Sequence, residues 1–483
     1  MRWSRGAQVT TNASVYWTSG DITFESGAWT HSGSSAFAVG NVGTFGSTSG
    51  GTLATAGSSS VTTSSATSAV INAPFQLGPG TSLAVGGGLL RFGGGSWADW
   101  AGSSAISSGE LEFFGGTTTF GTGSALSASA GQFSVTGGEV LVKTVLGDFS
   151  ATARCLVSGG DMRLSVAQPS CAWACTVSAG YLRVLAAARF TAQYGAPMTV
   201  SGGSMLLQAA TKLEGGLVVL SSGAVTVDAS SEVSGQLSVD GAGAIGVSSG
   251  QQLTVSGGGH SNPTSGNGIN LVAASSSVSF PSGTFDLQSA TGLTGVGSVL
   301  VSGGVVKVNA VLSGLTGPIM MSGGEHWILV AQPAFASTVT MSAGAFYVSA
   351  GPTTLSGAVN MTGGNLSSTA STTSASGMVM SGTASLAVNA GSSATTFTVA
   401  SGATACSFSG SALVTVAALQ TLNIRAVCAQ GGSATITGAG TLAIDTGAFA
   451  WSSGTWSTAV TTVASALTIS GSVTAANSVG LPG

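Results

Sequence analysis

The sequence predicts an all-β fold, a single elongated parallel β-helix (β-solenoid) with coils of about 20 residues. Three observations lead to this prediction. The composition is rich in small residues and poor in charge, a short Gly-containing motif returns at a nearly constant step, and polar and apolar residues alternate after each motif. Each observation restricts the fold in a different way.

The composition excludes ordinary charged domains, disordered chains and collagen. The 483 residues include 76 Gly but only 5% charged residues, where a soluble domain usually has about a quarter. Hydrophobic residues make up 43% of the chain, which is enough apolar surface to drive folding. Gly has no period of three and Pro occurs only 10 times, which excludes a collagen helix.

The repeated motif begins with Ser or Thr, continues with a small pair that usually contains Gly, and ends in an alternating segment. It occurs in two groups, and in the second group the steps between successive motifs differ by no more than one position. Equivalent strands at a constant step pair best with the next copy, in parallel and in register. The motifs begin at Thr136, Ser158, Ser178 and Ser201 in the first group and at Ser302, Ser322, Ser342, Thr362, Ser381 and Ser401 in the second.

The alternation after each motif predicts which side chains point into the coil. Asp161 and Arg163 lie three and five residues after Ser158, and Met162 lies between them. Period-two alternation is typical of a half-buried strand, so charged residues at odd positions are predicted outside and Met162 inside. His326 breaks the polar rule, because it lies four residues after Ser322 and is therefore predicted inside.

The chain divides into three stretches that we interpret as one continuous solenoid. Residues 1–130 are predicted to form irregular N-terminal coils, 131–410 a regular array, and 411–483 less regular C-terminal coils. Gly257–Asn270 interrupts the array, and its Gly, Asn and Pro residues predict a loop extruded from one coil.

The motif and its strands resemble those of repetitive β-solenoid surface proteins. Ser-Gly-Gly corners and strands such as Gly440-Thr441-Leu442-Ala443-Ile444 are similar to the repeats of autotransporter passengers and filamentous adhesins. The resemblance is one of architecture and covers most of the chain. It implies extracellular display and adhesion.

Two pairs of cysteines have spacings close to one coil. Cys155 and Cys175 are 20 residues apart and each lies three residues before its motif, so we expect them to stack in adjacent coils and predict a disulfide between them. Cys406 and Cys428, 22 residues apart, are a less favoured pair. The alternative for both pairs is that they are small buried hydrophobic residues.

Two groups of residues are candidate glycan contacts. Lys143, Arg163 and Arg183 come from three successive coils and could bind an anionic glycan, although an ordinary solvated face with nearby carboxylates is the favoured interpretation. Trp97 and Trp100 could stack on sugars, although aromatic side chains that fill corners are commoner.

No catalytic, cofactor or metal site is predicted. The three histidines, His31, His260 and His326, are far apart in sequence and lack a group of neighbouring carboxylates; Glu325 and His326 are interpreted as a pair on the coil surface. A net charge of −4 disfavours nucleic acid as a partner, and no apolar stretch is long enough for a transmembrane helix.

The leading hypothesis is a non-catalytic structural or adhesive rod, displayed at the cell surface or secreted. Its possible partners are glycans, other surface proteins and, end to end or laterally, copies of itself. The chain is expected to be a piece of a longer product that carries the signal and anchor elsewhere. The alternative is a carbohydrate-active or carbohydrate-binding β-helix. An antiparallel sandwich array or an outer-membrane barrel would need hairpins and aromatic girdles, and the constant step disfavours both.

Overall fold

The computed structural model describes most of the chain and consists of strands, turns and bends in the described part. The residues that it leaves undescribed are 1, 4–6, 19, 25–26, 33, 40–42, 48–51, 64–67, 94–99, 148, 151, 172–174, 192–196, 266–267, 313, 390, 392–393, 446–447, 464–466, 471–472, 476–478 and 481–483.

The chain forms two compact units. Unit 1 comprises residues 1–236 and 242–245, and unit 2 comprises 237–241 and 246–483. The strands of unit 1 are β1 Arg2–Trp3, β2 Ala7–Thr11, β3 Val15–Trp17, β4 Ile22–Phe24, β5 Gly27–His31, β6 Ala36–Val39, β7 Gly43–Ser47, β8 Thr52–Thr55, β9 Ser60–Thr63, β10 Ser68–Asn72, β11 Phe75–Leu77, β12 Ser82–Val85, β13 Leu89–Phe92, β14 Ser103–Ile106, β15 Glu110–Phe120, β16 Ala125–Ala128, β17 Gly131–Val142, β18 Ala153–Leu164, β19 Gln168–Cys171, β20 Cys175–Val184, β21 Ala188–Phe190, β22 Met198–Val200, β23 Ser204–Leu207, β24 Thr211–Leu213, β25 Leu217–Val219, β26 Ala224–Val227 and β27 Ser231–Val233.

One strand, β29 Ala244–Val247, has residues in both units. The strands of unit 2 are β28 Leu237–Gly241, β30 Gln252–Val255, β31 Gly259–Pro263, β32 Ile269–Leu271, β33 Ser277–Phe280, β34 Thr284–Leu287, β35 Leu293–Gly295, β36 Ser298–Val301, β37 Val305–Val308, β38 Ile319–Ile328, β39 Val339–Val348, β40 Thr353–Leu355, β41 Val359–Met361, β42 Asn365–Ser368, β43 Thr372–Ser374, β44 Gly377–Met380, β45 Ser385–Val388, β46 Thr396–Val399, β47 Ala405–Phe408, β48 Leu413–Val416, β49 Thr421–Ile424, β50 Cys428–Gln430, β51 Thr435–Ile444, β52 Phe449–Trp451, β53 Gly454–Val463, β54 Leu467–Ile469, β55 Val473–Ala475 and β56 Val479–Gly480.

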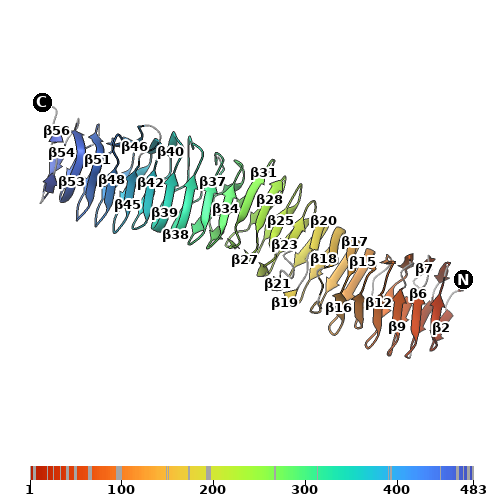
Figure 1. Cartoon of the computed structure of the whole chain (residues 1–483). Coiled ribbons are helices and arrows are strands. Elements are labelled where there is room, and N and C mark those ends of the chain that lie inside the picture. Colours follow the sequence, from red (N-terminus) through yellow and green to blue (C-terminus); the bar gives the residue numbers. More distant parts are fainter. Residues whose placement is uncertain are drawn as a thin grey trace. The chain divides into compact units, whose positions relative to one another are not determined.

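Each unit is a parallel β-solenoid, as the sequence predicts, and its coils have three strand-bearing faces. In unit 1 the faces begin with the strand series β2-β5-β8-β11, β3-β6-β9-β12-β14-β16 and β4-β7-β10-β13-β15. In unit 2 they include β39-β41-β44-β47, β40-β43-β46-β49 and β39-β42-β45-β48. Every pairing in these series is parallel, and Figure 1 shows the strands of each unit stacked as successive coils.

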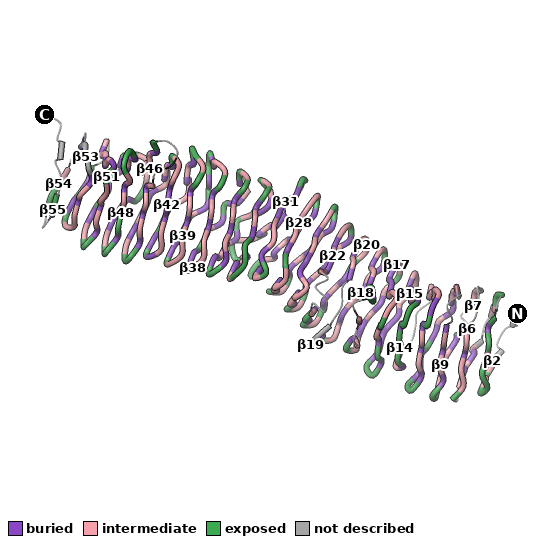
Figure 2. The backbone as a smooth tube through the Cα atoms, viewed as in Figure 1, coloured by how far each residue is buried: buried purple, intermediate pink, exposed green. Residues whose placement is uncertain are grey.

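The predicted inside and outside positions are confirmed. Met162 and Phe346 are fully buried, and Asp161 and Arg163 keep part of their surface exposed. His326 is only 1% exposed, so the inward prediction from its position is correct and the interpretation of a surface pair with Glu325 is wrong. Figure 2 shows the same alternation of buried and partly exposed residues along most strands.

The core of unit 1 is more aromatic than the composition suggests. Phe92 stacks on Phe113 with ring centroids 5.5 Å apart, and both rings contact the buried Trp100. Large rings stack because equivalent inward positions of adjacent coils lie about 4.8 Å apart, within the distance range that aromatic pairs prefer. The core of these coils therefore contains a cluster of large rings.

At several corners of unit 2, the Ser or Thr of the motif anchors the corner to the preceding coil. The backbone N–H of Thr362 donates to the carbonyl of Met341 at 2.9 Å, and its hydroxyl donates to the same oxygen at 3.4 Å. Ser381 makes the same two bonds to Met361, at 2.8 and 3.5 Å. A hydroxyl at this position therefore adds a second donor to a carbonyl that the ladder already uses.

The second Gly of the motif turns the corner. Gly324 has a φ of +67°, and a Cβ built there would lie 2.3 Å from the carbonyl oxygen of Gly304 in the preceding coil. Left-handed backbone is strained for residues with a side chain, and the coil below leaves no space for one. Both restrictions explain why the motif needs Gly at this position.

Two sequence predictions about register are wrong. Ser401 was expected to be equivalent to Ser381, but Ser409 occupies that position, because its N–H and hydroxyl donate to the carbonyl of Met380. The coil between them is 28 residues long in its Leu386–Val414 pairing. Gly257–Asn270 is not an extruded loop, because it contains β31 and the start of β32, and β31 pairs with β28 and β34.

Replacement of Gly324 by Ala should destabilise unit 2 by about 1–3 kcal/mol, because the left-handed φ is strained for Ala and the new Cβ meets the carbonyl of Gly304. Chemical denaturation followed by circular dichroism measures the effect. Gly402→Ala is the matched control, since a Cβ at Gly402 has no atom within 4 Å. Equal unfolding midpoints for the two variants would contradict this account of the corner.

Candidate functional site

Charged side chains of unit 1 form an ion-paired surface on β17, β18 and β20. The guanidinium of Arg163 lies 2.9 Å from Glu139 and 2.8 Å from Asp161, and that of Arg183 lies 3.1 Å from Asp161. The hydrogen bond to Asp161 raises the pKa of Arg163 above its ordinary value, and the charge of Glu139 acts in the same direction. Arg183 also lies over the ring of Tyr181, 4.9 Å from its centroid.

Arg163 and Arg183 stack directly, but Lys143 is not in line with them. Arg163 pairs with Leu141 in the preceding coil and with Arg183 in the next. Lys143 lies two residues beyond Leu141, where its N–H donates to the carbonyl of Phe120. The three residues therefore form no single basic stripe, and carboxylates partner both arginines. Contact of these residues with a glycan stays a prediction.

The structure tests only one of the two tryptophans that were predicted to contact sugars. Trp97 lies outside the described residues. Trp100 is fully buried, packs against Phe113 and Phe120, and donates its indole N–H to the carbonyl of Phe75 at 3.1 Å. Because neither face of the Trp100 ring is exposed, it cannot stack on a sugar. The prediction for Trp100 is therefore wrong, and this ring is part of the core.

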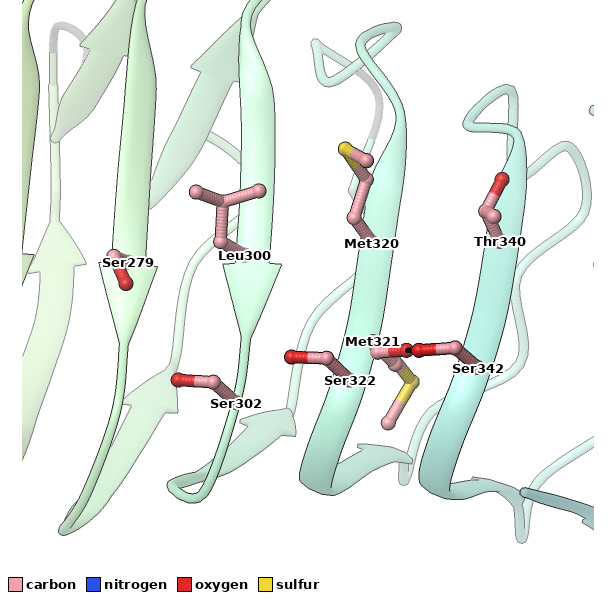
Figure 3. Close-up of a pocket in the computed structure, with 8 residues that line it drawn as sticks. All are labelled: Ser279, Leu300, Ser302, Met320, Met321, Ser322, Thr340 and Ser342. Atoms are coloured by element: carbon pink, nitrogen blue, oxygen red, sulfur yellow. Dashed lines mark hydrogen bonds between the residues drawn. The ribbon is translucent and has the colours of Figure 1, made fainter. Parts of the chain in front are cut away.

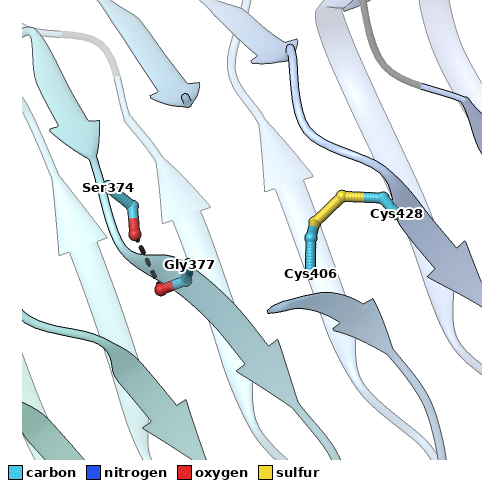
Figure 4. Close-up of a disulfide and its surroundings, with 4 residues drawn as sticks. All are labelled: Ser374, Gly377, Cys406 and Cys428. Carbon is cyan, nitrogen blue, oxygen red and sulfur yellow. Dashed lines mark hydrogen bonds between the residues drawn. A yellow bond between two sulfur atoms is a disulfide. The ribbon is translucent and has the colours of Figure 1, made fainter. Parts of the chain in front are cut away.

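The cysteines lie in adjacent coils as expected. Cys155 pairs in register with Cys175, and both side chains are buried. The structure contains a disulfide between Cys406 and Cys428, with Cα atoms 4.5 Å apart (Figure 4). It links β47 to β50 across one coil, at the pair that the sequence favoured less. The structure contains no disulfide between Cys155 and Cys175, so the bond predicted for this pair is wrong, although the in-register pairing is correct.

A row of polar and aromatic side chains runs along one outer face of unit 2. We call it the polar–aromatic row and define it by five residues that are opposite one another in β31, β34, β37, β38 and β39. Their Cα atoms pair in succession, and all five are partly exposed. The row consists of His260, Asp286, Lys307, Trp327 and Tyr347.

The side chains of this row are held by specific contacts. The imidazole Nε2 of His260 lies 3.0 Å from a carboxylate oxygen of Asp240. The indole N–H of Trp327 donates to Glu325 at 2.7 Å. The rings of Trp327 and Tyr347 stack with centroids 3.9 Å apart and planes 20° apart. These contacts fix the orientation of side chains on a partly exposed surface.

Sequence reasoning missed this row although a signal existed. The five residues follow one another at steps of one coil each. In unit 2, the position of a residue relative to its motif indicates whether it points outward, but not which residues of neighbouring coils lie beside it. His260 was also assigned to an extruded loop, which removed the first member from the array.

A shallow groove lies on a neighbouring face of unit 2. Its volume is about 300 Å³, and Figure 3 shows that Leu300 and Met320 lie along one side and hydroxyl groups of the motif serines along the other. Met320 is 45% exposed. The motif serines that line this groove are Ser302, Ser322 and Ser342.

His326 lies behind the row, inside the coil. Its ring stacks on Phe346 with centroids 4.8 Å apart and planes 2° apart. Among the residues that the structure describes, no hydrogen-bond partner reaches its Nδ1 atom. Burial lowers the pKa of His326 to about 4, since an imidazolium in the core would lose its hydration. The side chain is therefore a neutral, ring-shaped part of the core.

Within the described part of the chain, no three His, Cys, Asp or Glu side chains lie close enough together to hold a metal ion. The described residues also include no helix with the length and hydropathy of a membrane span.

Comparisons of the chain with protein-family models, curated proteins and solved structures gave no match. The pairing of strands in this chain confirms the β-solenoid part of the predicted resemblance. Kinship with autotransporter passengers or filamentous adhesins stays a prediction.

Unit 2 should lose stability as the pH falls from 6.5 to 4. In this range the unfolded chain protonates His326 near its ordinary pKa of 6.5, whereas the folded chain does not until about pH 4. The unfolded state therefore binds more protons, and the free energy of unfolding should fall by about 3 kcal/mol across the window.

His326→Phe should remove that part of the pH dependence and raise stability at pH 7, because Phe keeps the stack on Phe346 without a buried unpaired nitrogen. Denaturant unfolding of both proteins between pH 4 and 7 measures the difference, in which all other titrating groups cancel. Parallel curves for the two proteins would show that His326 is not a buried neutral base.

Proposed function

We propose that this protein is a non-catalytic structural or adhesive rod that is displayed at the cell surface or secreted. The observation that supports the proposal best is the repeated parallel ladder with short outward side chains. On β42 and β45, for example, the partly exposed residues Asn365, Ser385 and Ala387 are all small. Such faces present the same chemistry at each coil, which suits many weak contacts along a surface.

The proposal of an adhesive rather than purely structural role draws on the polar–aromatic row. Unit 2 has six charged residues, and four of them, Asp240, Asp286, Lys307 and Glu325, lie in or beside the row. In a chain with so little charge, this concentration favours a binding surface. The carbohydrate-binding alternative is therefore a special case of the same proposal.

The disulfide supports an oxidising compartment. Disulfides persist in secreted and surface proteins and are reduced in the cytosol of most organisms. Cys406 and Cys428 are buried and close one coil of the solenoid, so the bond stabilises a local loop. We infer that the protein resides outside the reducing cytosol.

Alkylation of the denatured protein, isolated from its natural source without reductant, tests the compartment. Mass spectrometry should find Cys406 and Cys428 unmodified before reduction and modified after it, and denaturation removes protection by burial. Modification of both residues before reduction would contradict residence in an oxidising compartment.

Incubation with a panel of polysaccharides tests the absence of catalysis. We expect retention of the purified chain on some of the immobilised polysaccharides and no release of reducing ends over a day, because the carboxylates of the ion-paired surface are engaged by arginine. Enzymatic release of reducing ends would overturn the non-catalytic proposal and leave the fold unchanged.

A further inference from the structure

We propose that Tyr347 forms the aromatic wall of a binding site for a neutral saccharide on unit 2. The ring of Trp327, which stacks on Tyr347, supports this wall from the preceding coil. The inference deepens the proposed adhesive function and rests on it, because it names the ligand class and the residues that bind it. Three features support the site: a face of the Tyr347 ring that no second ring covers, polar groups beside that face, and a local charge that disfavours other ligands.

Only one face of the Tyr347 ring is covered by an aromatic neighbour. Trp327 stacks on it from the preceding coil at a centroid distance of 3.9 Å. On the other side, the residue opposite Tyr347 is Ser367, and the one opposite Ser367 is Ala387. These side chains have two and one heavy atoms, too few to cover a phenol ring. The floor beside the second ring face therefore consists of two small residues, of which Ser367 is 7% exposed and Ala387 is partly exposed.

Hydrogen-bonding groups flank this floor on both sides. The hydroxyl of Ser385 donates to the amide oxygen of Asn365 at 3.0 Å. On the other side, the amide nitrogen of Asn389 donates to the hydroxyl of Ser367 at 2.8 Å, so this amide lies against the floor itself. Glu325 lies on the same coil as Trp327 and accepts its indole N–H. An apolar ring wall with amides, hydroxyls and a carboxylate around it matches a ligand that has both C–H faces and hydroxyl groups.

The charge of the row selects among saccharides. It contains the carboxylate of Asp286, with Glu325 and Asp240 beside the row, against one ammonium group on Lys307. Net negative charge disfavours nucleic acid and anionic glycans, whose binding depends on basic groups. Carboxylates accept hydrogen bonds only, so they suit the hydroxyl donors of a neutral sugar.

A peptide ligand is disfavoured by the pairing of the strands. Peptides often bind a sheet by adding a strand to a free edge. Here β38 has β37 and β39 as neighbours, and β39 has β38 and β42, so their main chains are already paired on both sides. Recognition at this face must use side chains, which again favours ring stacking.

The direction of the row also favours a polymer. Its five positions lie in successive coils, each about 4.8 Å from the next, and end at Tyr347. A saccharide chain that stacks on Tyr347 can continue toward the carboxylates at the other end or across the floor. Several weak contacts in line raise the affinity for a polymer above that for a single sugar.

Affinity electrophoresis in native gels tests the proposal, with hydroxyethylcellulose, laminarin or galactomannan as neutral probes and alginate as the anionic probe. We expect the wild-type chain to be retarded by at least one neutral probe and not by alginate. Tyr347→Ala and Trp327→Ala should weaken the binding by about tenfold, the loss of one aromatic stack. Tyr347→Phe keeps the ring and should bind within about threefold of wild type.

Tyr181→Ala is the matched control, since Tyr181 is a partly exposed ring on a strand face of unit 1 beside Arg183, and it should not change the binding. Unfolding midpoints of all variants establish that they are folded. Two results overturn the proposal: binding to none of the neutral probes, or equal binding by wild type and Tyr347→Ala. If the Tyr347→Ala variant is retarded as strongly as the wild type, the site is refuted but the adhesive function is not. Release of reducing ends would instead refute the non-catalytic function.

Discussion

Main-chain hydrogen bonding between consecutive coils is the constraint on which each unit depends. A strand such as β39 uses its N–H and C=O groups toward β38 on one side and toward β41 and β42 on the other. Coils must then follow one another at the spacing of paired strands, about 4.8 Å. The corners, the core and the outer faces all adapt to that spacing. Gly is required where a Cβ would meet the coil below, and short hydroxylated residues are favoured where side chains are directly above one another.

The same spacing governs where charge is tolerated. Equivalent residues of adjacent coils are too close for like charges without partners. Arg163 and Arg183 stack directly, and the carboxylate of Asp161 contacts both of them. On unit 2 the row instead alternates in character, with Asp286 beside Lys307 and then two stacked rings. The low charge of the chain therefore follows from its architecture.

The sequence predicts the architecture well where coil length is constant. Between Ser302 and Ser381 the motifs return at an almost constant step, and the structure aligns them as expected. Prediction fails where a coil is longer, because Ser401 keeps the expected spacing but Ser409 makes the contacts. The number of strands in each coil was not predicted, since strands such as β40 have only three residues and too few alternations to recognise.

Much less of the candidate site could be predicted. Burial of Trp100 depends on how three faces close around the core, which local alternation does not reveal. The polar–aromatic row depends on register across five coils, and the step from His260 to Asp286 is longer than the steps that follow it. A single sequence indicates which residues point outward, but their neighbours are determined by coil lengths that vary.

The variable coil length has a consequence for how such a chain can change over time. Gain or loss of one entire coil leaves inward residues inward and outward residues outward, and it adds or removes one set of paired strands. Duplication and deletion of such segments are therefore well tolerated. An insertion of a single residue inside a strand is different, since it turns every following side chain of that strand from interior to exterior. Insertions of intermediate size are accommodated at corners, as in the long coil between Leu386 and Val414. Natural length variation in this protein should therefore occur in multiples of a coil or at its corners.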